Sequence, residues 1–243
     1  MSIAFNGTTQ YAHIVAVPSV AAFLVAGWFR RDSDSAWFEW QWSVDAGDAT
    51  NRTSLKIDII DRMRAERASI VEIETVDPAV VSTWYYVMVR YATGTLTVQH
   101  LVDGGSAWVG NASVGSLADL APTAFGIGAM HFQGTPAFFA PLTSAGVKVW
   151  STTLPSDAEV LAEREYRDAI VTAGLWATYR FKTGALADDH SGNARTLTLT
   201  ATPTFSADDP TAILGDSASA GGGGRLVSGA LLGRSLVGGS LAQ

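Results

Sequence analysis

Three carboxylates on one short stretch are the residues of this sequence best placed for acid–base chemistry. The stretch reads Glu72-Ile73-Glu74-Thr75-Val76-Asp77. Successive side chains of a β-strand point to opposite faces, so Glu72 and Glu74 would share one face. Hydrolysis of a glycosidic bond uses two carboxyl groups that flank the bond. Glycoside hydrolysis is therefore one hypothesis for this stretch, and a solvated strand face is the simpler interpretation.

Oxygen-bearing side chains gather a second time at Asp188, Asp189 and Asn193. Carboxylate and amide oxygens are ligands that calcium accepts, which makes these three residues candidates for a calcium site. An Asx turn explains the same residues with fewer assumptions. No pair of histidines has the i, i+2 or i, i+4 spacing that directs two imidazoles at one metal, so we expect no histidine-bound metal and no cofactor. The histidines are His13, His100, His131 and His190.

Aromatic residues dominate the stretch from residue 37 to residue 42, which reads Trp-Phe-Glu-Trp-Gln-Trp. Phe38, Trp40 and Trp42 would share one strand face, and a half-buried strand packs its more apolar face in the core. The other face would then present a platform on which the apolar side of a sugar ring can stack. Packing alone explains the same pattern, so both interpretations stay open. The platform residues are Trp37, Glu39 and Gln41.

The elements that must position these candidates are strands. Leu55, Ile57 and Ile59 alternate with Lys56 and Asp58, which is typical of a strand with one buried face. Many short strands separated by Gly, Asn and Asp indicate a β-sandwich or a β-barrel. The same alternation covers 71–75, 87–91 and 95–99, and Thr93-Gly94 predicts a hairpin between the last two.

One segment departs from the strand pattern. Ser156 and Glu159 have the spacing of a capping box, in which the hydroxyl and the carboxylate each bind a free backbone amide of the first helical turn. We therefore predict one short helix near 156–170, with Gly174 beyond its end. Leu175, Ala177 and Tyr179 follow as a further strand.

Composition and charge exclude several classes of function. The net charge of −7 and the lack of clustered Lys or Arg argue against a nucleic-acid partner. Arg30-Arg31 is the one basic doublet, which we interpret as a solvated strand end. The chain has no cysteine, and no Lys or Arg precedes Arg30, so we expect neither disulfides nor a secretory signal. Pro18 interrupts the longest apolar stretch, so we expect no membrane insertion.

Several motifs in order resemble the laminin G-type family. Thr83-Trp84-Tyr85-Tyr86-Val87, continuing to Leu101-Val102-Asp103-Gly104, is similar to the family's long strand, tight turn and returning strand that ends in Val-Asp-Gly. Ala4–Tyr11 and Phe23–Phe29 resemble its opening and central strands. Gly174–Phe205 is similar to a segment that often precedes such a domain and here follows it.

The resemblance covers roughly residues 3–210. It implies an all-β, concanavalin A-like jelly-roll sandwich of two antiparallel sheets. The capping box adds one short helix near 156–170, and the composition adds an extended C-terminal tail. It implies no single function, because this architecture serves lectins, glycosidases, adhesion modules and virion components. Glycosidases of this architecture carry Glu, Asp and Glu on alternate strand positions. This chain has Glu72, Glu74 and Asp77, and Pro78 follows, which weakens that hypothesis.

The composition changes near residue 217, which divides the chain into a sandwich over 1–216 and a Gly/Leu-rich assembly tail over 217–243. Leu-Val and Leu-Leu pairs recur there at a spacing that fits neither a helix nor a strand. We expect the tail to become ordered against partner subunits through apolar contacts and two arginines. The predicted contact residues are Arg225, Leu226, Val227, Leu231, Leu232, Arg234, Leu236, Val237 and Leu241.

The first functional hypothesis is a non-enzymatic structural or decoration protein of a bacteriophage particle, on the head or the tail. Only 16% of the residues are charged, against about 25% in typical domains, which favours association with other virion proteins or as a homo-oligomer. Phage proteins leave the host cytoplasm by lysis, which fits a virion protein that lacks a signal. The second hypothesis is a glycan-binding module that recognises a host-surface glycan. A glycoside hydrolase is the third.

Overall fold

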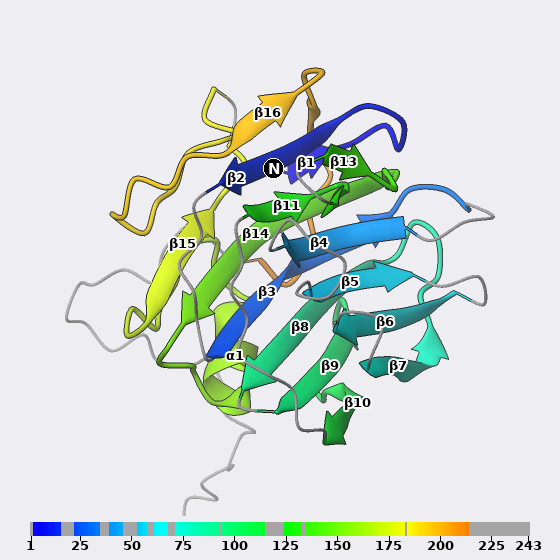
Figure 1. The fold of residues 1–243 in the computed structure, drawn as a ribbon, viewed down its shortest axis with the longest axis vertical. Helices are drawn as coiled ribbons and strands as arrows, with labels where there is room; N and C mark the ends of the chain where they lie inside the picture. The colour runs from blue at the N-terminus through cyan, green and yellow to red at the C-terminus, as the bar shows by residue number, and fades with distance from the viewer. Residues whose placement is uncertain are drawn as a thin grey trace, which may run out of the picture.

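Two antiparallel sheets form the described part of the chain (Figure 1). The structure is a computed structural model that describes residues 2–15, 22–34, 39–45, 53–57, 61–67, 71–92, 94–114, 124–132, 135–182 and 184–213. The tail residues 217–243 and Trp37 lie outside these ranges, as do the side chains of Glu39 and Gln41. The division at residue 217 and the sugar platform therefore stay predictions.

The larger sheet has eight strands within the described ranges. Seven follow the order β10-β9-β8-β3-β14-β1-β17, and β15 pairs with β14. Their bounds are β1 Ser2–Ala4, β3 Ala22–Arg31, β8 Trp84–Ala92, β9 Thr95–Val102, β10 Val109–Val114, β14 Leu142–Ser151, β15 Leu175–Tyr179 and β17 Thr204–Ser206.

The smaller sheet has seven strands among the described residues, in the order β16-β2-β11-β4-β5-β6-β7. A short hairpin of β12 (Met130–Phe132) and β13 (Thr135–Ala137) stands apart from both sheets. The architecture confirms the predicted all-β sandwich. The bounds of the smaller sheet are β2 Tyr11–Val15, β4 Glu39–Asp45, β5 Thr53–Ile57, β6 Arg62–Arg67, β7 Val71–Pro78, β11 Ala124–Ile127 and β16 Thr198–Thr200.

Strand β8 shows how the sequence builds two apolar layers. Tyr85 and Val87 point into the core between the sheets, whereas Trp84 and Tyr86 join a second cluster on the other face. Both faces are buried, which explains why the segment is apolar almost throughout. The predicted hairpin at residues 93–94 is confirmed, since Ala92 pairs with Thr95.

The helix α1 (Asp157–Glu163) covers the second cluster and ends earlier than predicted. The capping box of Ser156 and Glu159 is present. The extension to residue 170 is wrong, because the carboxylate of Glu163 accepts hydrogen bonds from the backbone amides of Ile170 and Val171. These bonds hold the following chain in a turn instead of a further helical turn.

The interpretation of Arg30-Arg31 as a solvated strand end is wrong for Arg31. Its side chain is 2% exposed, and its guanidinium pairs with the carboxylates of Asp34 and Asp61. Each carboxylate supplies a charge-assisted partner, which makes the buried cation tolerable.

The segment after the helix completes the sandwich, as the sequence predicted. Strand β15 pairs with β14, β16 with β2, and β17 with β1. Asp103, from the Val-Asp-Gly stretch, accepts hydrogen bonds from the backbone amides of Thr211 and Ala212. Within the described ranges, no helix has the length and apolar composition that crossing a membrane requires.

Candidate functional site

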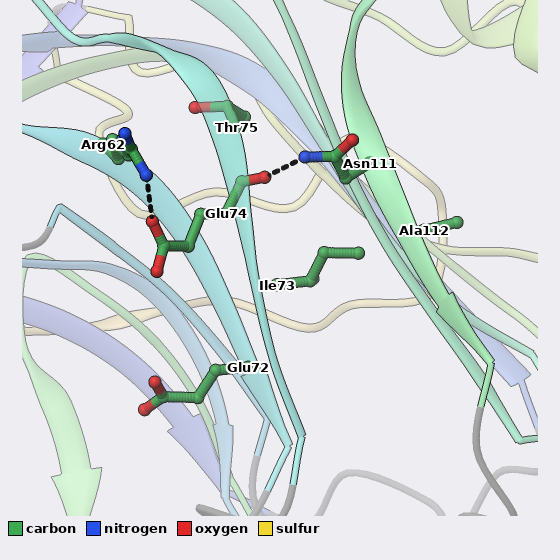
Figure 2. Close-up of a pocket in the computed structure, with 7 residues that line it drawn as sticks. All are labelled: Arg62, Glu72, Ile73, Glu74, Thr75, Asn111 and Ala112. Atoms are coloured by element: carbon green, nitrogen blue, oxygen red, sulfur yellow. Dashed lines mark hydrogen bonds and ion pairs between the residues drawn. The ribbon is translucent and has the colours of Figure 1, made fainter.

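The edge strands of the two sheets, β7 and β10, lie beside each other along one side of the sandwich (Figure 2). They belong to different sheets, yet the side-chain amide of Asn111 on β10 donates a hydrogen bond to the backbone carbonyl of Glu74 on β7. Unpaired edge groups invite other chains to pair with them. The side chain of Asn111 binds one such group, the carbonyl of Glu74, and so links the two edges.

A groove of about 480 Å³ runs along this edge, and we call it the edge groove. Ile73 and Thr75 line it and are buried, whereas the side chains of Glu72 and Glu74 reach the surface, 42% and 32% exposed. The alternation of a strand produces this division. The lining residues are Arg62, Glu72, Ile73, Glu74, Thr75, Asn111 and Ala112.

The groove carboxylates are held in place by cations on the neighbouring strand β6. Arg64 contacts Glu72 at 2.6 Å and Glu74 at 2.8 Å, and Arg62 contacts Glu74 at 2.9 Å. Single exposed ion pairs contribute little stability, but several joined pairs fix the orientation of their side chains. The network therefore presents carboxylate oxygens and guanidinium groups in set positions.

The network continues into the protein through Lys56 of β5. Lys56 pairs with Glu66, and both residues are buried. Its ammonium nitrogen also lies 3.5 Å from a carboxylate oxygen of Glu72. Lys56 does face away from the core, as the alternation predicted, but it is covered rather than solvated. The charge network of the groove thus extends to a buried ion pair.

The structure brings together two of the three carboxylates that suggested hydrolysis. Glu72 and Glu74 line the edge groove, whereas Asp77 lines a separate pocket. Glycoside hydrolysis needs one carboxyl group on each side of the scissile bond. Glu72 and Glu74 project from the same strand face, and each pairs with a guanidinium. The groove therefore offers paired carboxylates and guanidinium groups that can form hydrogen bonds.

Asp189 forms the Asx turn that the sequence offered as an alternative to calcium. Its carboxylate accepts hydrogen bonds from the backbone amides of Ser191, Thr178 and Arg195, each at 2.9 Å. Burial alone would raise the pKa of Asp189, but these bonds together outweigh burial and lower the pKa. The turn accounts for both carboxylate oxygens.

The other calcium candidates have different surroundings. Asn193 donates hydrogen bonds to the carbonyls of Leu175 and Trp176, each at 3.1 Å, and Asp188 is exposed. Among the described residues, no group of three or more His, Asp or Glu side chains is arranged to hold a metal ion. The calcium site stays a prediction without structural support.

Two features next to these residues were not predicted from the sequence. Arg62 and Arg64 alternate on β6 and form ion pairs with Glu74 and Glu72 of β7, a complementary pattern of charges that the sequence does contain. His100 is buried beside Asp77 and Tyr85 in the second pocket, and a lone histidine in an alternating strand gives no such signal.

No protein-family model matches the chain, and no curated protein sequence is similar to it. Solved structures are similar in fold. The "putative carbohydrate binding protein" from Bacteroides ovatus superposes with a TM-score of 0.60 at 16% identity, over 84% of this chain and 58% of that one. A heptameric SAP-like pentraxin from Limulus polyphemus gives a TM-score of 0.50 at 15% identity, over 69% of this chain and 81% of that one.

A bacteriophage protein shares the fold as well. Tailspike protein 2 of the Escherichia coli O157:H7 bacteriophage CAB120 has a TM-score of 0.52 at 12% identity, over 70% of this chain and 25% of that one. The chain thus spans little more than half of the Bacteroides protein and a quarter of the tailspike. These likenesses confirm the jelly-roll sandwich that the laminin G-type motifs implied.

Proposed function

We propose that this protein is a glycan-binding sandwich that holds an oligosaccharide in the edge groove without cleaving it. The observation that carries the proposal is an open groove along β7 whose lining includes Arg62, Glu72, Glu74 and Asn111, with the two carboxylates on one side of the strand and Asn111 on the other. A few placed polar groups over an apolar floor are typical of ligand sites. Here Ile73, on the side of β7 opposite to the two carboxylates, supplies an apolar part of the lining.

The side chains of the groove match the chemistry of sugar hydroxyls. A hydroxyl group both donates and accepts hydrogen bonds. The carboxylates of Glu72 and Glu74 accept, and the guanidinium of Arg62 and the amide of Asn111 donate. Because the ion pairs already orient these groups, little side-chain entropy is lost when a ligand binds. The groove follows a strand edge, which suits an extended chain of sugars.

The fold comparisons support the proposal without establishing it. A structure named for carbohydrate binding covers most of this chain, and a phage tailspike contains the same kind of sandwich. Fold alone assigns no function, so the groove residues carry the argument.

A structural role in a bacteriophage particle is the second candidate, and the tailspike likeness favours it. The two roles are compatible, since a virion protein can use a glycan site to attach to its host. This role makes the tail of residues 217–243 an assembly segment, with other virion proteins or further copies of the chain as partners. A truncation that ends at Ser217 should keep the fold and fail to assemble, and normal assembly would contradict this role.

A glycan array tests the main proposal. The purified protein should bind one class of oligosaccharide, and binding should weaken in Glu74→Gln. Incubation with the bound oligosaccharide should leave it intact. Hydrolysis that Glu72→Gln abolishes would show that the groove is catalytic and would contradict the proposal.

A further inference from the structure

A second, more enclosed pocket of about 280 Å³ opens on the same side of the sandwich. Strand β7 contributes Asp77 to it, and β9 and β10 contribute His100 and Val109. The edge groove lies next to this pocket on β7 and on β10. Thr75 of the groove is two residues from Asp77, and Asn111 is two residues from Val109. Two residues of a strand span about 7 Å, which a disaccharide also spans. We call this second pocket the His100 pocket.

The imidazole of His100 is buried, and its Nδ1 atom has no hydrogen-bond partner among the described residues. The ring packs edge-on against Tyr85, with the ring centroids 5.6 Å apart. The hydroxyl oxygen of Tyr85 accepts a hydrogen bond from the backbone amide of Val80 at 2.9 Å. Buried polar atoms almost always have partners. His100 lines the pocket, so a group that arrives with a ligand would supply the missing partner once the buried ring turns toward it.

Much of the remaining lining is apolar, and two of its valines are exposed. Val102 is 45% exposed and Val109 is 36% exposed, and both line the pocket together with Leu101 and Ala107. They belong to the small set of large apolar side chains that are exposed in the described part of the chain. Apolar side chains gathered at a pocket mouth are typical of a binding site.

Charge decides which ligands fit. The exposed carboxylate of Asp77 at the mouth disfavours anions. Burial lowers the pKa of His100, and the charge of Asp77 opposes that effect in part, so the ring is neutral near pH 7. A neutral imidazole offers either a donor or an acceptor at Nδ1, depending on its tautomer. A hydroxyl group satisfies both tautomers.

We infer that the His100 pocket binds one neutral sugar ring of the glycan held in the edge groove, with a ring hydroxyl on Nδ1 of His100 and the apolar ring face on Val109. This inference rests on the proposed function and adds that the protein discriminates against acidic sugars at this position. Asp77 supplies the discrimination.

Nitrogen NMR of the imidazole tests the inference on the full-length protein. The probes are the neutral methyl glycosides of glucose, galactose, mannose and rhamnose, with methyl sialoside as the acidic comparison. His100→Gln identifies the His100 signals. At least one neutral glycoside should shift the Nδ1 signal, and methyl sialoside should leave it unchanged. A panel without any shift, or a shift with sialoside alone, would overturn the inference.

Variants separate the pocket from the groove. Val109→Trp fills the mouth, and Val15→Trp is the matched control on a valine that is 59% exposed on β2. Val109→Trp should abolish the shift and lower the affinity for the array-selected oligosaccharide about ten-fold, and Val15→Trp should do neither. Binding that resists Val109→Trp but is lost in Glu74→Gln would overturn the pocket and leave the proposed function standing. Binding that resists both variants would overturn both.

Discussion

The ammonium group of Lys148 lies 2.6 Å from the carboxylate of Glu163, and both side chains are fully buried. Lys148 also donates to the backbone carbonyls of Glu163 and Tyr166. The pair connects β14 to the end of α1. We predict that Lys148→Met lowers the free energy of unfolding by about 3–5 kcal/mol, because it leaves a buried carboxylate without its cation. Urea denaturation measures this loss. The double variant Lys148→Met/Glu163→Gln should recover part of it, and equal losses would contradict the account.

From the lowered pKa of Lys148 we predict that the free energy of unfolding rises at alkaline pH. Burial lowers the pKa of Lys148 to about 8, although Glu163 opposes that effect. The unfolded value is near 10.5, so the unfolded chain binds more protons between these two pH values, and stability increases with pH. Urea midpoints from about pH 8 to about pH 9.5 should rise in the wild type and stay flatter in Lys148→Met. Tyrosines begin to ionise in the unfolded chain at the upper end of this range, and both proteins share that effect. A parallel pH dependence would contradict the assignment.

Trp84 tests the second apolar cluster. Its side chain is 7% exposed, and the guanidinium of Arg30 lies 5.4 Å from its ring centroid. Trp84→Ala should cost about 3–5 kcal/mol, the range for removing a large buried aromatic residue. Trp84→Phe serves as the control and should cost less. A Trp84→Ala variant that melts as the wild type does would show that the cluster contributes little.

The Asx turn at Asp189 makes a prediction that also tests calcium. Asp189→Asn removes a carboxylate oxygen that accepts hydrogen bonds from Arg195 and Ser191, and should cost about 1–3 kcal/mol. Asp188→Asn on the exposed neighbour should cost nothing measurable. Thermal melting with and without added calcium should give the same Tm. A higher Tm with calcium, lost in Asp189→Asn, would show that the residue binds the ion.

Local signals predicted the elements well because they act over a few residues. The alternation of 84–91, the capping box of Ser156 and Glu159, and the turn at Asp189 each depend on near neighbours in the sequence. All three are present in the structure. The helix end was missed because it depends on side-chain contacts of Glu163, which alternation and propensity do not encode.

Buried charge was the feature that sequence reasoning could not supply. Lys148 stands between Val147 and Val149, so alternation predicts an exposed side chain, and only the position of Glu163 explains its burial. Arg31 is the same case, because Asp61 reaches it from a distant segment. Predicting the edge groove from the sequence would also require the register of β6 on β7. That register sets Arg64 opposite Glu74 and contains a bulge beside Arg62.

Isothermal titration with the glycan selected on the array tests the central claim most directly. Glu74→Gln and Asn111→Ala alter the edge groove, and Glu165→Gln is the matched control on the chain that follows α1. We predict that each groove variant lowers the affinity about ten-fold or more, the loss of a hydrogen bond to a charged or fixed polar group, while all variants stay folded at the temperature of the titration. The control should bind as tightly as the wild type. Equal affinity in the wild type and both groove variants would contradict glycan binding in the edge groove.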